Sequence, residues 1–101
     1  MEAENQKAFF EQLIETMLDE LVDLVKQGNK WGAKHGYPLL EKYPQYPRVR
    51  AIGREFAAIG GFVMMQRVCE GLQRKLAATP RANQDINLVI YGWAEIEGWE
   101  V

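Results

Sequence analysis

The sequence predicts an all-α fold, in which residues 1–101 form a single domain of three to four helices. Apolar residues recur at spacings of three and four along most of the chain, which is typical of amphipathic helices. The one stretch with β-type composition, residues 88–91, would find no partner strand elsewhere in the chain. The composition, 48% hydrophobic and 26% charged, is ordinary for one globular domain with a modest core.

The first helix is predicted over about residues 4–27. Its apolar residues follow helical spacing from Phe10 to Leu24, and acidic residues occupy the opposite face. Acidic residues in the first turns and Lys26 in the last turn suit the helix dipole. Gly28 is expected to end this helix in a left-handed conformation.

Residues 28–47 are predicted to form a loop rich in glycine, proline and aromatic residues. This segment shows no helical or strand periodicity, and its prolines disfavour helical dihedral angles at the tyrosines that precede them. A single helical turn can form within it at residues 39–43. The aromatic residues argue against a plain flexible linker, which would be rich in glycine and serine.

Two helices, at about residues 48–59 and 62–77, are predicted to meet at a corner formed by Gly60 and Gly61. On one continuous helix, the apolar seams on either side of the glycines would be out of phase by about 100°. A glycine pair inside a helix also costs roughly 2 kcal/mol relative to two alanines. Both facts favour Gly60 as the residue that follows the first of these helices, and Gly61 as the start of the next.

The alternative is one long helix from Pro47 to Ala78. In that helix Gly53 and Gly60 lie seven residues apart and nearly on the same face. Together they would form a shallow groove that a crossing helix can enter closely. The sequence leaves both arrangements open.

A last helix is predicted at about residues 84–97. The apolar residues from Ile86 to Ile96 match helical spacing over eleven residues, although the short β-type stretch within them would also suit a strand. Gly98 is expected to end this helix.

The charges are unevenly distributed, although the formal net charge is only −2. Residues 1–23 carry seven acidic side chains and one lysine, whereas residues 24–54 carry seven basic side chains against Glu41 alone. One interpretation is that the basic segment neutralises the acidic first helix, in the same chain or in a dimer partner. The other interpretation is that the basic segment binds an anionic ligand.

The sequence offers no catalytic, cofactor-binding or metal-binding site that we can assign. Cys69 and His35 are the only cysteine and histidine, so neither an internal disulfide nor a closed zinc site can form. Cys69 falls on an apolar seam, where a thiol behaves as a small hydrophobe, and His35 lies in the basic loop. The glycine spacing matches no phosphate-binding loop. We therefore expect a protein that is not an enzyme and that holds no cofactor.

The leading functional hypothesis is a small interaction or adaptor protein that acts by binding. The apolar stripe of the first helix is broader than the short helices are expected to cover, and tryptophan is common at interaction hot spots. We therefore predict a homodimer or another protein partner, bound through these two features. The candidate interface residues are Phe10, Met17, Leu21, Leu24, Trp93 and Trp99.

The alternative hypothesis is a nucleic-acid or anionic-ligand binding module that uses the basic aromatic segment 26–54. Its aromatic rings would stack on bases while lysines and arginines meet phosphates. The candidate binding residues are Lys30, Trp31, Lys34, His35, Tyr37, Lys42, Tyr43, Arg48 and Arg50. The acidic pI of about 5.4 counts against this class of protein.

A cytoplasmic location, without a membrane span, is expected for the chain. No stretch approaches the roughly 20 apolar residues of a transmembrane helix. The N-terminal residues lack the basic start and the apolar run of a secretory signal. A single cysteine also suits a reducing compartment.

Overall fold

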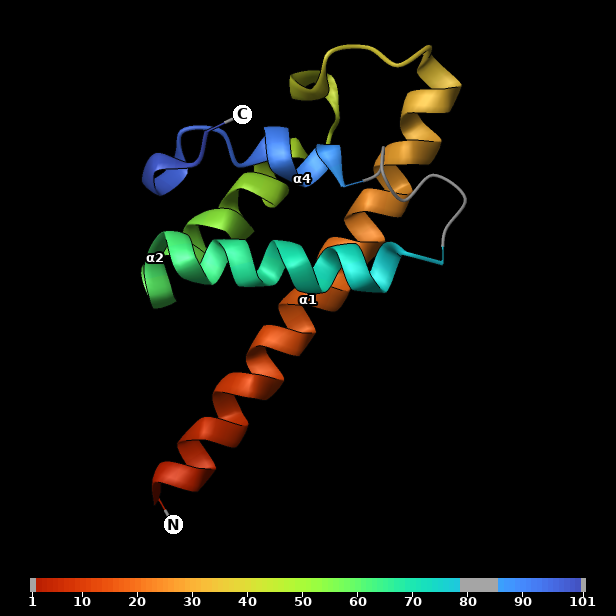
Figure 1. Ribbon diagram of the computed structural model, residues 1–101. Helices are drawn as coiled ribbons and strands as arrows, with labels where there is room; N and C mark the ends of the chain where they lie inside the picture. The colour runs from red at the N-terminus through yellow and green to blue at the C-terminus, as the bar shows by residue number, and fades with distance from the viewer. Residues whose placement is uncertain (1, 79–85, 101) are drawn as a thin grey trace.

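The structure is a computed structural model that describes residues 2–78 and 86–100, with side chains from residue 11 onward. These residues form α-helices and 3₁₀ turns and no strand, so the predicted all-α fold is confirmed (Figure 1). In chain order the elements are α1 (Glu2–His35), η1 (Leu40–Lys42), α2 (Tyr46–Leu76), α4 (Asn87–Gly92) and η2 (Ile96–Gly98).

α1 is longer than predicted, because it continues past Gly28 to His35. The loop predicted at residues 28–47 is therefore wrong over its first part. Gly28 stays helical because its bare backbone is used for packing: a Cβ added there would collide with Leu88 and lie 3.1 Å from the ring of Tyr43. A glycine that reads as a helix end in the sequence is thus a place of close approach inside the helix.

The glycine that ends α1 is Gly36, whose φ of 76° lies in the left-handed region. The N–H of Tyr37 donates to the carbonyl of Gly32 at 2.7 Å, which is the longer hydrogen bond of a Schellman motif. The chain then turns through η1, where the sequence predicted one helical turn at residues 39–43.

α2 contains the predicted corner. Gly61 has φ 68° and ψ −158°, a conformation that essentially only glycine adopts. The two arms of α2, residues 46–60 and 62–76, therefore run in different directions (Figure 1). The prediction needs one correction, since the residue outside the helical region is Gly61 and not Gly60.

The alternative of one uninterrupted helix is wrong. Another part of the chain does approach Gly53 closely, as that alternative expected, but it is a side chain and not a helix. The Trp93 ring lies against Gly53, and a Cβ added to Gly53 would lie 2.6 Å from Trp93 Cδ1. A single aromatic side chain, and not a crossing helix, occupies the space that this glycine leaves.

The last helix is shorter than predicted. α4 ends at Gly92, whereas the sequence predicted helix over residues 84–97, of which residues 84 and 85 lie outside the described part. The Arg50 guanidinium donates to the carbonyls of Gly92 and Ala94 at 2.9 and 3.0 Å. These bonds satisfy carbonyl groups that a continuing helix would have paired internally.

A reversal of the chain follows α4. Glu95 and Glu97 have φ values of 71° and 47°, and the N–H of Glu95 donates to the carbonyl of Trp99 at 2.9 Å. This turn brings Trp99 back onto Trp93, with the two ring centroids 5.3 Å apart in an edge-on arrangement.

The core lies where α1 packs on the two arms of α2, and α4 and the C-terminal turn close it (Figure 1). Its fully buried side chains include Leu21, Ile52, Phe56, Leu72 and Trp93. The 34 residues of α1 span about 50 Å at 1.5 Å per residue, which accounts for the longest molecular dimension of 52 Å. Among the described residues, no helix combines the length and the apolar character needed to span a bilayer.

Candidate functional site

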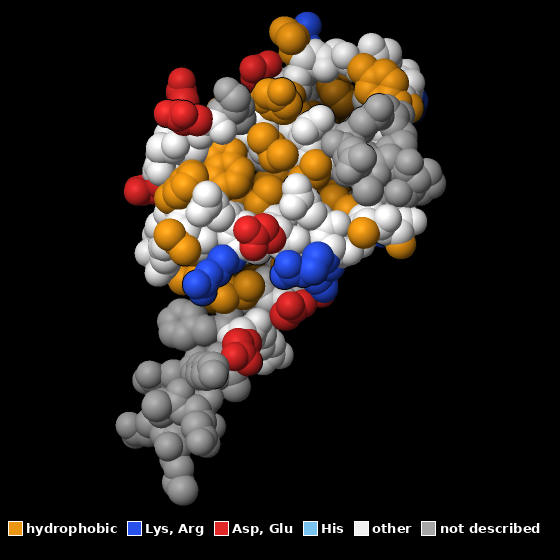
Figure 2. Space-filling model, in the orientation of Figure 1, with side chains coloured by type: hydrophobic (Ala, Val, Ile, Leu, Met, Phe, Trp, Pro, Cys, Tyr) orange, Lys and Arg blue, Asp and Glu red, His pale blue; other side chains and the backbone are white. Residues whose placement is uncertain are grey.

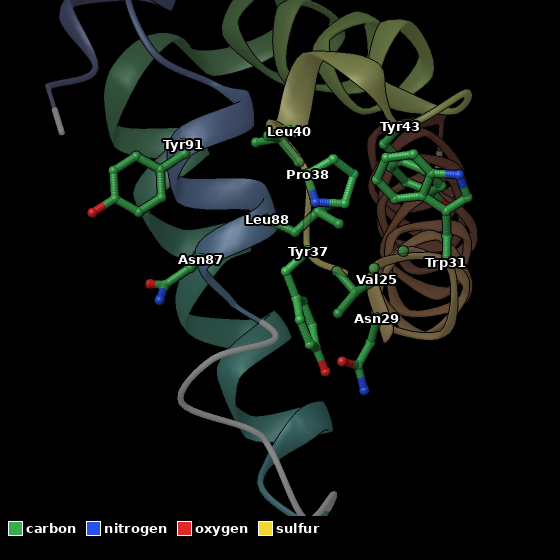
Figure 3. A pocket seen from close by; sticks show the side chains of 12 residues that line it. Val25, Asn29, Trp31, Tyr37, Pro38, Leu40, Tyr43, Asn87, Leu88 and Tyr91 are labelled. Atoms are coloured by element: carbon green, nitrogen blue, oxygen red, sulfur yellow. The ribbon is translucent and has the colours of Figure 1, made fainter. Parts of the chain in front are cut away.

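A pocket of about 270 Å³ lies between the C-terminal part of α1, the segment around η1, and α4 (Figure 3). Its aromatic lining residues are Trp31, Tyr37, Tyr43 and Tyr91, and its aliphatic ones are Val25, Pro38, Leu40 and Leu88. We call this site the aromatic pocket. It is built largely from the segment that the sequence marked as unusual.

Gly28 and Gly32 form the α1 side of the aromatic pocket. They lie four residues apart, so they leave a bare strip on one face of the helix. Tyr37 packs over this strip, since a Cβ added to Gly32 would lie 3.0 Å from the Tyr37 ring. Leu88 of α4 packs at Gly28. The continuation of α1 to His35 is therefore what creates the pocket.

Trp31 and Tyr43 form one wall. Their ring centroids are 5.5 Å apart, and the His35 ring lies 5.1 Å from Trp31 on α1. The Tyr43 hydroxyl is buried and donates to the carbonyl of Leu24 at 2.9 Å, and burial raises the pKa of this hydroxyl. Tyr43 is thereby fixed as part of the scaffold, while Trp31 is only half-buried.

Two asparagines supply polar groups to the aromatic pocket. Asn29 on α1 and Asn87 on α4 lie on opposite sides of it (Figure 3). Each amide offers both hydrogen-bond donors and an acceptor. An apolar lining with a few polar groups is the usual chemistry of a site that buries an apolar group and orients it by hydrogen bonds.

None of the lysines that the sequence placed in the binding patch lines the aromatic pocket. Lys30 lies midway between Gly28 and Gly32, so it points to the opposite face of α1 from the pocket. Lys34 follows Lys30 at a spacing of four on that solvent-exposed face. Of the other predicted patch residues, the exposed ones are His35, Tyr37 and Lys42.

The two arginines of the predicted patch are engaged within the chain. The Arg48 guanidinium donates to the Glu20 carboxylate at 2.5 and 2.8 Å and lies 3.5 Å from Glu55. This bidentate contact lowers the pKa of Glu20, and the attraction to Arg48 adds to the effect. Arg50 is bonded to the carbonyls at the end of α4. Arg48 thus neutralises one acid of the first helix, whereas Glu15 and Asp19 pair with Lys75, which lies outside the basic segment.

Five of the six predicted interface residues lie in the core of the single chain and not on its surface. Met17, Leu21 and Leu24 are buried, Trp93 is fully buried, and Trp99 is 8% exposed. The two arms of α2 pack against the part of the apolar stripe from Met17 to Val25, whereas Leu13 on the same stripe is 36% exposed. The sixth residue, Phe10, has a side chain outside the described part of the chain.

A second exposed apolar region lies at the corner of α2. Ile59, Phe62 and Val63 are exposed there. Figure 2 shows hydrophobic side chains gathered on the face formed by the second arm of α2 and the C-terminal segment, with charged side chains along the second arm.

Two further observations concern possible metal ligands and the single cysteine thiol. No group of three or more His, Cys, Asp or Glu residues that could hold a metal ion occurs among them. Cys69 is buried, as its place on the apolar seam predicted, and burial together with the nearby Glu70 charge raises the pKa of its thiol. A thiol with a raised pKa is a poor nucleophile at neutral pH.

Sequence reasoning missed Asn29, Leu40, Asn87, Leu88 and Tyr91 as pocket residues. The three from α4 are separated from α1 by more than fifty positions, so no local pattern joins them. One signal was available: glycines at residues 28, 32 and 36 recur every four positions, which marks a bare strip on a helix. Because prolines follow closely in the sequence, a loop was predicted here and not a helix.

In comparisons with known proteins, no family model, no curated protein and no solved structure matches this chain.

Proposed function

We propose that this protein is a non-enzymatic binding module that holds an apolar anchor side chain of a partner protein in the aromatic pocket. The observation that carries the proposal is an open, aromatic-lined pocket that includes Trp31. The other two tryptophans, Trp93 and Trp99, are buried in the core. Protein-binding sites concentrate their affinity where an aromatic or aliphatic anchor fills such a pocket.

The size of the pocket favours one anchor over a larger ligand. Its volume of about 270 Å³ lies just below the range of about 300–1,000 Å³ that is usual for small-molecule sites. A side chain at the tip of a peptide needs less room than a whole cofactor. The apolar surface beside the pocket would then meet the rest of the peptide.

The rim of the pocket supplies that surface. Tyr37 and Tyr91 line the aromatic pocket and are 55% and 54% exposed, and Leu39, which lines an adjoining hollow with Tyr91, is 69% exposed. A partner that covers them would gain about 25 cal/mol of binding free energy for each Å² of apolar surface that it buries. Tyrosine also combines apolar contact with a hydrogen-bonding hydroxyl, which suits a surface that alternates between free and bound.

Anionic-ligand binding is the second candidate, and the exposed lysines on α1 favour it. Lys26, Lys30 and Lys34 recur at a spacing of four, so they form one column on the helix. Of the aromatic residues of the pocket, Trp31 borders this column, because it precedes Lys34 by three residues on α1. A titration with single-stranded oligonucleotides at low salt tests this candidate, since phosphate contacts make binding steeply salt-dependent.

The homodimer and the cytoplasmic location stay predictions. Five of the six residues first assigned to the dimer are buried, so a dimer would need exposed apolar residues, such as those at the corner of α2 or at the rim of the aromatic pocket. Light scattering at micromolar concentration measures the mass directly, and a monomer mass would exclude the dimer.

The test of the proposed function is a selection from a library of short random peptides against the folded protein. We expect enriched peptides to share an aromatic or large aliphatic residue. Tyr91→Ala should weaken their binding about tenfold, the size typical of an interface hot spot. The matched control is Val63→Ala, because Val63 is 56% exposed at the distant corner, and it should change binding less than about twofold. Failure to enrich any peptide, or equal losses in both variants, would contradict the proposal.

A further inference from the structure

A second hollow adjoins the aromatic pocket, and the two share Leu40 and Tyr91 as walls. Its remaining lining differs in chemistry, because it includes the carboxylates of Glu41 and Glu95. We call it the acidic hollow. Figure 3 shows Tyr91 at one side of the aromatic pocket.

The two carboxylates are available to a ligand. Glu41 and Glu95 are both exposed, and within the described residues neither forms an ion pair or a side-chain hydrogen bond. They come from elements far apart in the sequence, η1 and the turn after α4, yet they line one hollow. Two carboxylates on one site favour a cation and disfavour an anion.

Arg50 also lines the acidic hollow. Its guanidinium donates to the carbonyls of Gly92 and Ala94 and lies over the Tyr46 ring, with its carbon 6.0 Å from the ring centroid. Arg50 forms no ion pair with either carboxylate among the described residues, so its positive charge offsets only one of the two negative charges. The lining of the hollow therefore keeps a net negative charge.

We propose that the partner segment carries a lysine or arginine close to its apolar anchor, and that Glu41 and Glu95 bind this basic side chain. This inference rests on the proposed binding of an apolar anchor in the aromatic pocket. Since the two sites share a wall and an extended chain advances about 3.3 Å per residue, the basic residue should lie about one to three positions from the anchor. The recognised feature is then a pair of neighbouring residues, one apolar and one basic.

The experiment uses sets of synthetic peptides that share one aromatic anchor and differ only at the neighbouring positions, which carry lysine, glutamine or glutamate. Fluorescence anisotropy of labelled peptides gives each dissociation constant. We expect the lysine peptide to bind about threefold to tenfold more tightly than its glutamine counterpart at low salt, since exposed charge pairs are weak. The glutamate peptide should bind more weakly still, and the differences should shrink at high salt.

A matched pair of protein variants locates the effect. The double variant Glu41→Gln with Glu95→Gln should lose the preference for lysine. The control double variant, Glu97→Gln with Glu100→Gln, changes the net charge by the same amount and should keep the preference. Glu97 is a close control for Glu95, because it is exposed in the same turn and also has a positive φ, but it does not line the hollow.

The outcomes separate the two proposals. Peptides that need Tyr91 for binding but show no charge preference would overturn this inference and leave the proposed function standing. A charge preference lost equally in both double variants would also overturn it, because the effect would then come from net charge alone. No binding by any peptide, whatever its charge, would overturn the proposed function together with this inference.

Discussion

Two aromatic clusters differ in how the chain surrounds their tryptophans. In the core cluster (Phe56, Phe62, Trp93 and Trp99), the Trp93 indole N–H donates to the carbonyl of Val49 at 3.0 Å, and that of Trp99 to Ile90 at 2.9 Å. In the pocket cluster (Trp31, His35, Tyr37 and Tyr43), no acceptor within the described residues meets the Trp31 indole N–H.

The difference shows that similar composition serves two purposes. Glycine gives close approach in both clusters, but at Gly53 a whole indole fills the space, whereas at Gly28 and Gly32 the approaching side chains leave a hollow between them. An aromatic cluster whose rings are buried and whose indole N–H groups are hydrogen-bonded stabilises the fold. A cluster of the same residue types that lines an open pocket can bind a ligand. The core cluster should therefore govern stability and the pocket cluster should govern binding.

The largest effect is expected at the centre of the core cluster. Trp93→Ala should lower the free energy of unfolding by about 3–5 kcal/mol, because it removes a fully buried side chain and leaves a cavity. Chemical denaturation followed by circular dichroism measures this loss. If the variant does not fold, Trp93→Phe supplies a smaller change in the same direction. A loss below about 1 kcal/mol for Trp93→Ala would mean that the core cluster does not carry the fold.

A smaller effect is expected from filling the space that Trp93 occupies. Gly53→Ala should destabilise the protein by about 1–3 kcal/mol, because the new methyl group would lie 2.6–2.7 Å from the buried indole and must displace it. Gly71→Ala in the second arm of α2 is the matched control, since its nearest neighbour is Leu18 at an ordinary 3.4 Å. It should stabilise the helix by up to about 1 kcal/mol. Equal signs for the two changes would contradict the packing described at Gly53.

The Glu20–Arg48 pair lies outside both clusters and should contribute less. Its hydrogen bonds lower the pKa of Glu20 in the folded protein, so its contribution is present above the ordinary value near 4.5 and is lost as the pH falls through the lowered one. Both side chains are more than a third exposed, which limits the contribution to about 1 kcal/mol at most. Thermal melts of wild type and Glu20→Gln should differ at neutral pH and converge in acid. A constant difference at every pH would argue against this pair as its source.

The smallest effect on stability is expected at the rim of the pocket. Tyr91→Ala should change the free energy of unfolding by no more than about 0.5 kcal/mol, because the side chain is 54% exposed. The same variant should bind selected peptides more weakly, so one denaturation curve and one binding isotherm together separate the two roles. A destabilisation comparable to that of Gly53→Ala would show that the rim belongs to the core.

The sequence predicted the parts of this fold that depend on local pattern. The out-of-phase seams at residues 59 and 62 located the corner, because helical phase is a local property. The burial of Cys69 followed from the same seam. The end of α1 could not be found this way, since Gly28 and Gly36 carry equivalent local signals. Only the packing of Leu88 and Tyr43 against Gly28 decides between them.

The candidate site was predicted in part. Trp31, Tyr37 and Tyr43 were singled out from the sequence, and the structure brings them together. Their grouping with the lysines assumed a loop in which neighbours share a surface, whereas α1 continues to His35. On a helix, adjacent residues such as Lys30 and Trp31 point in directions about 100° apart. The contribution of α4 depends on tertiary contacts that no local pattern records.

The most direct test of the account uses the three tryptophan indole N–H signals in a nuclear magnetic resonance spectrum. The protein is titrated with a peptide selected for binding, and each signal is assigned by substitution. The account predicts that the Trp31 signal shifts as the peptide saturates the site, while those of Trp93 and Trp99 stay in place. A shift of the Trp93 or Trp99 signal with Trp31 unmoved would contradict the assignment of binding to the aromatic pocket.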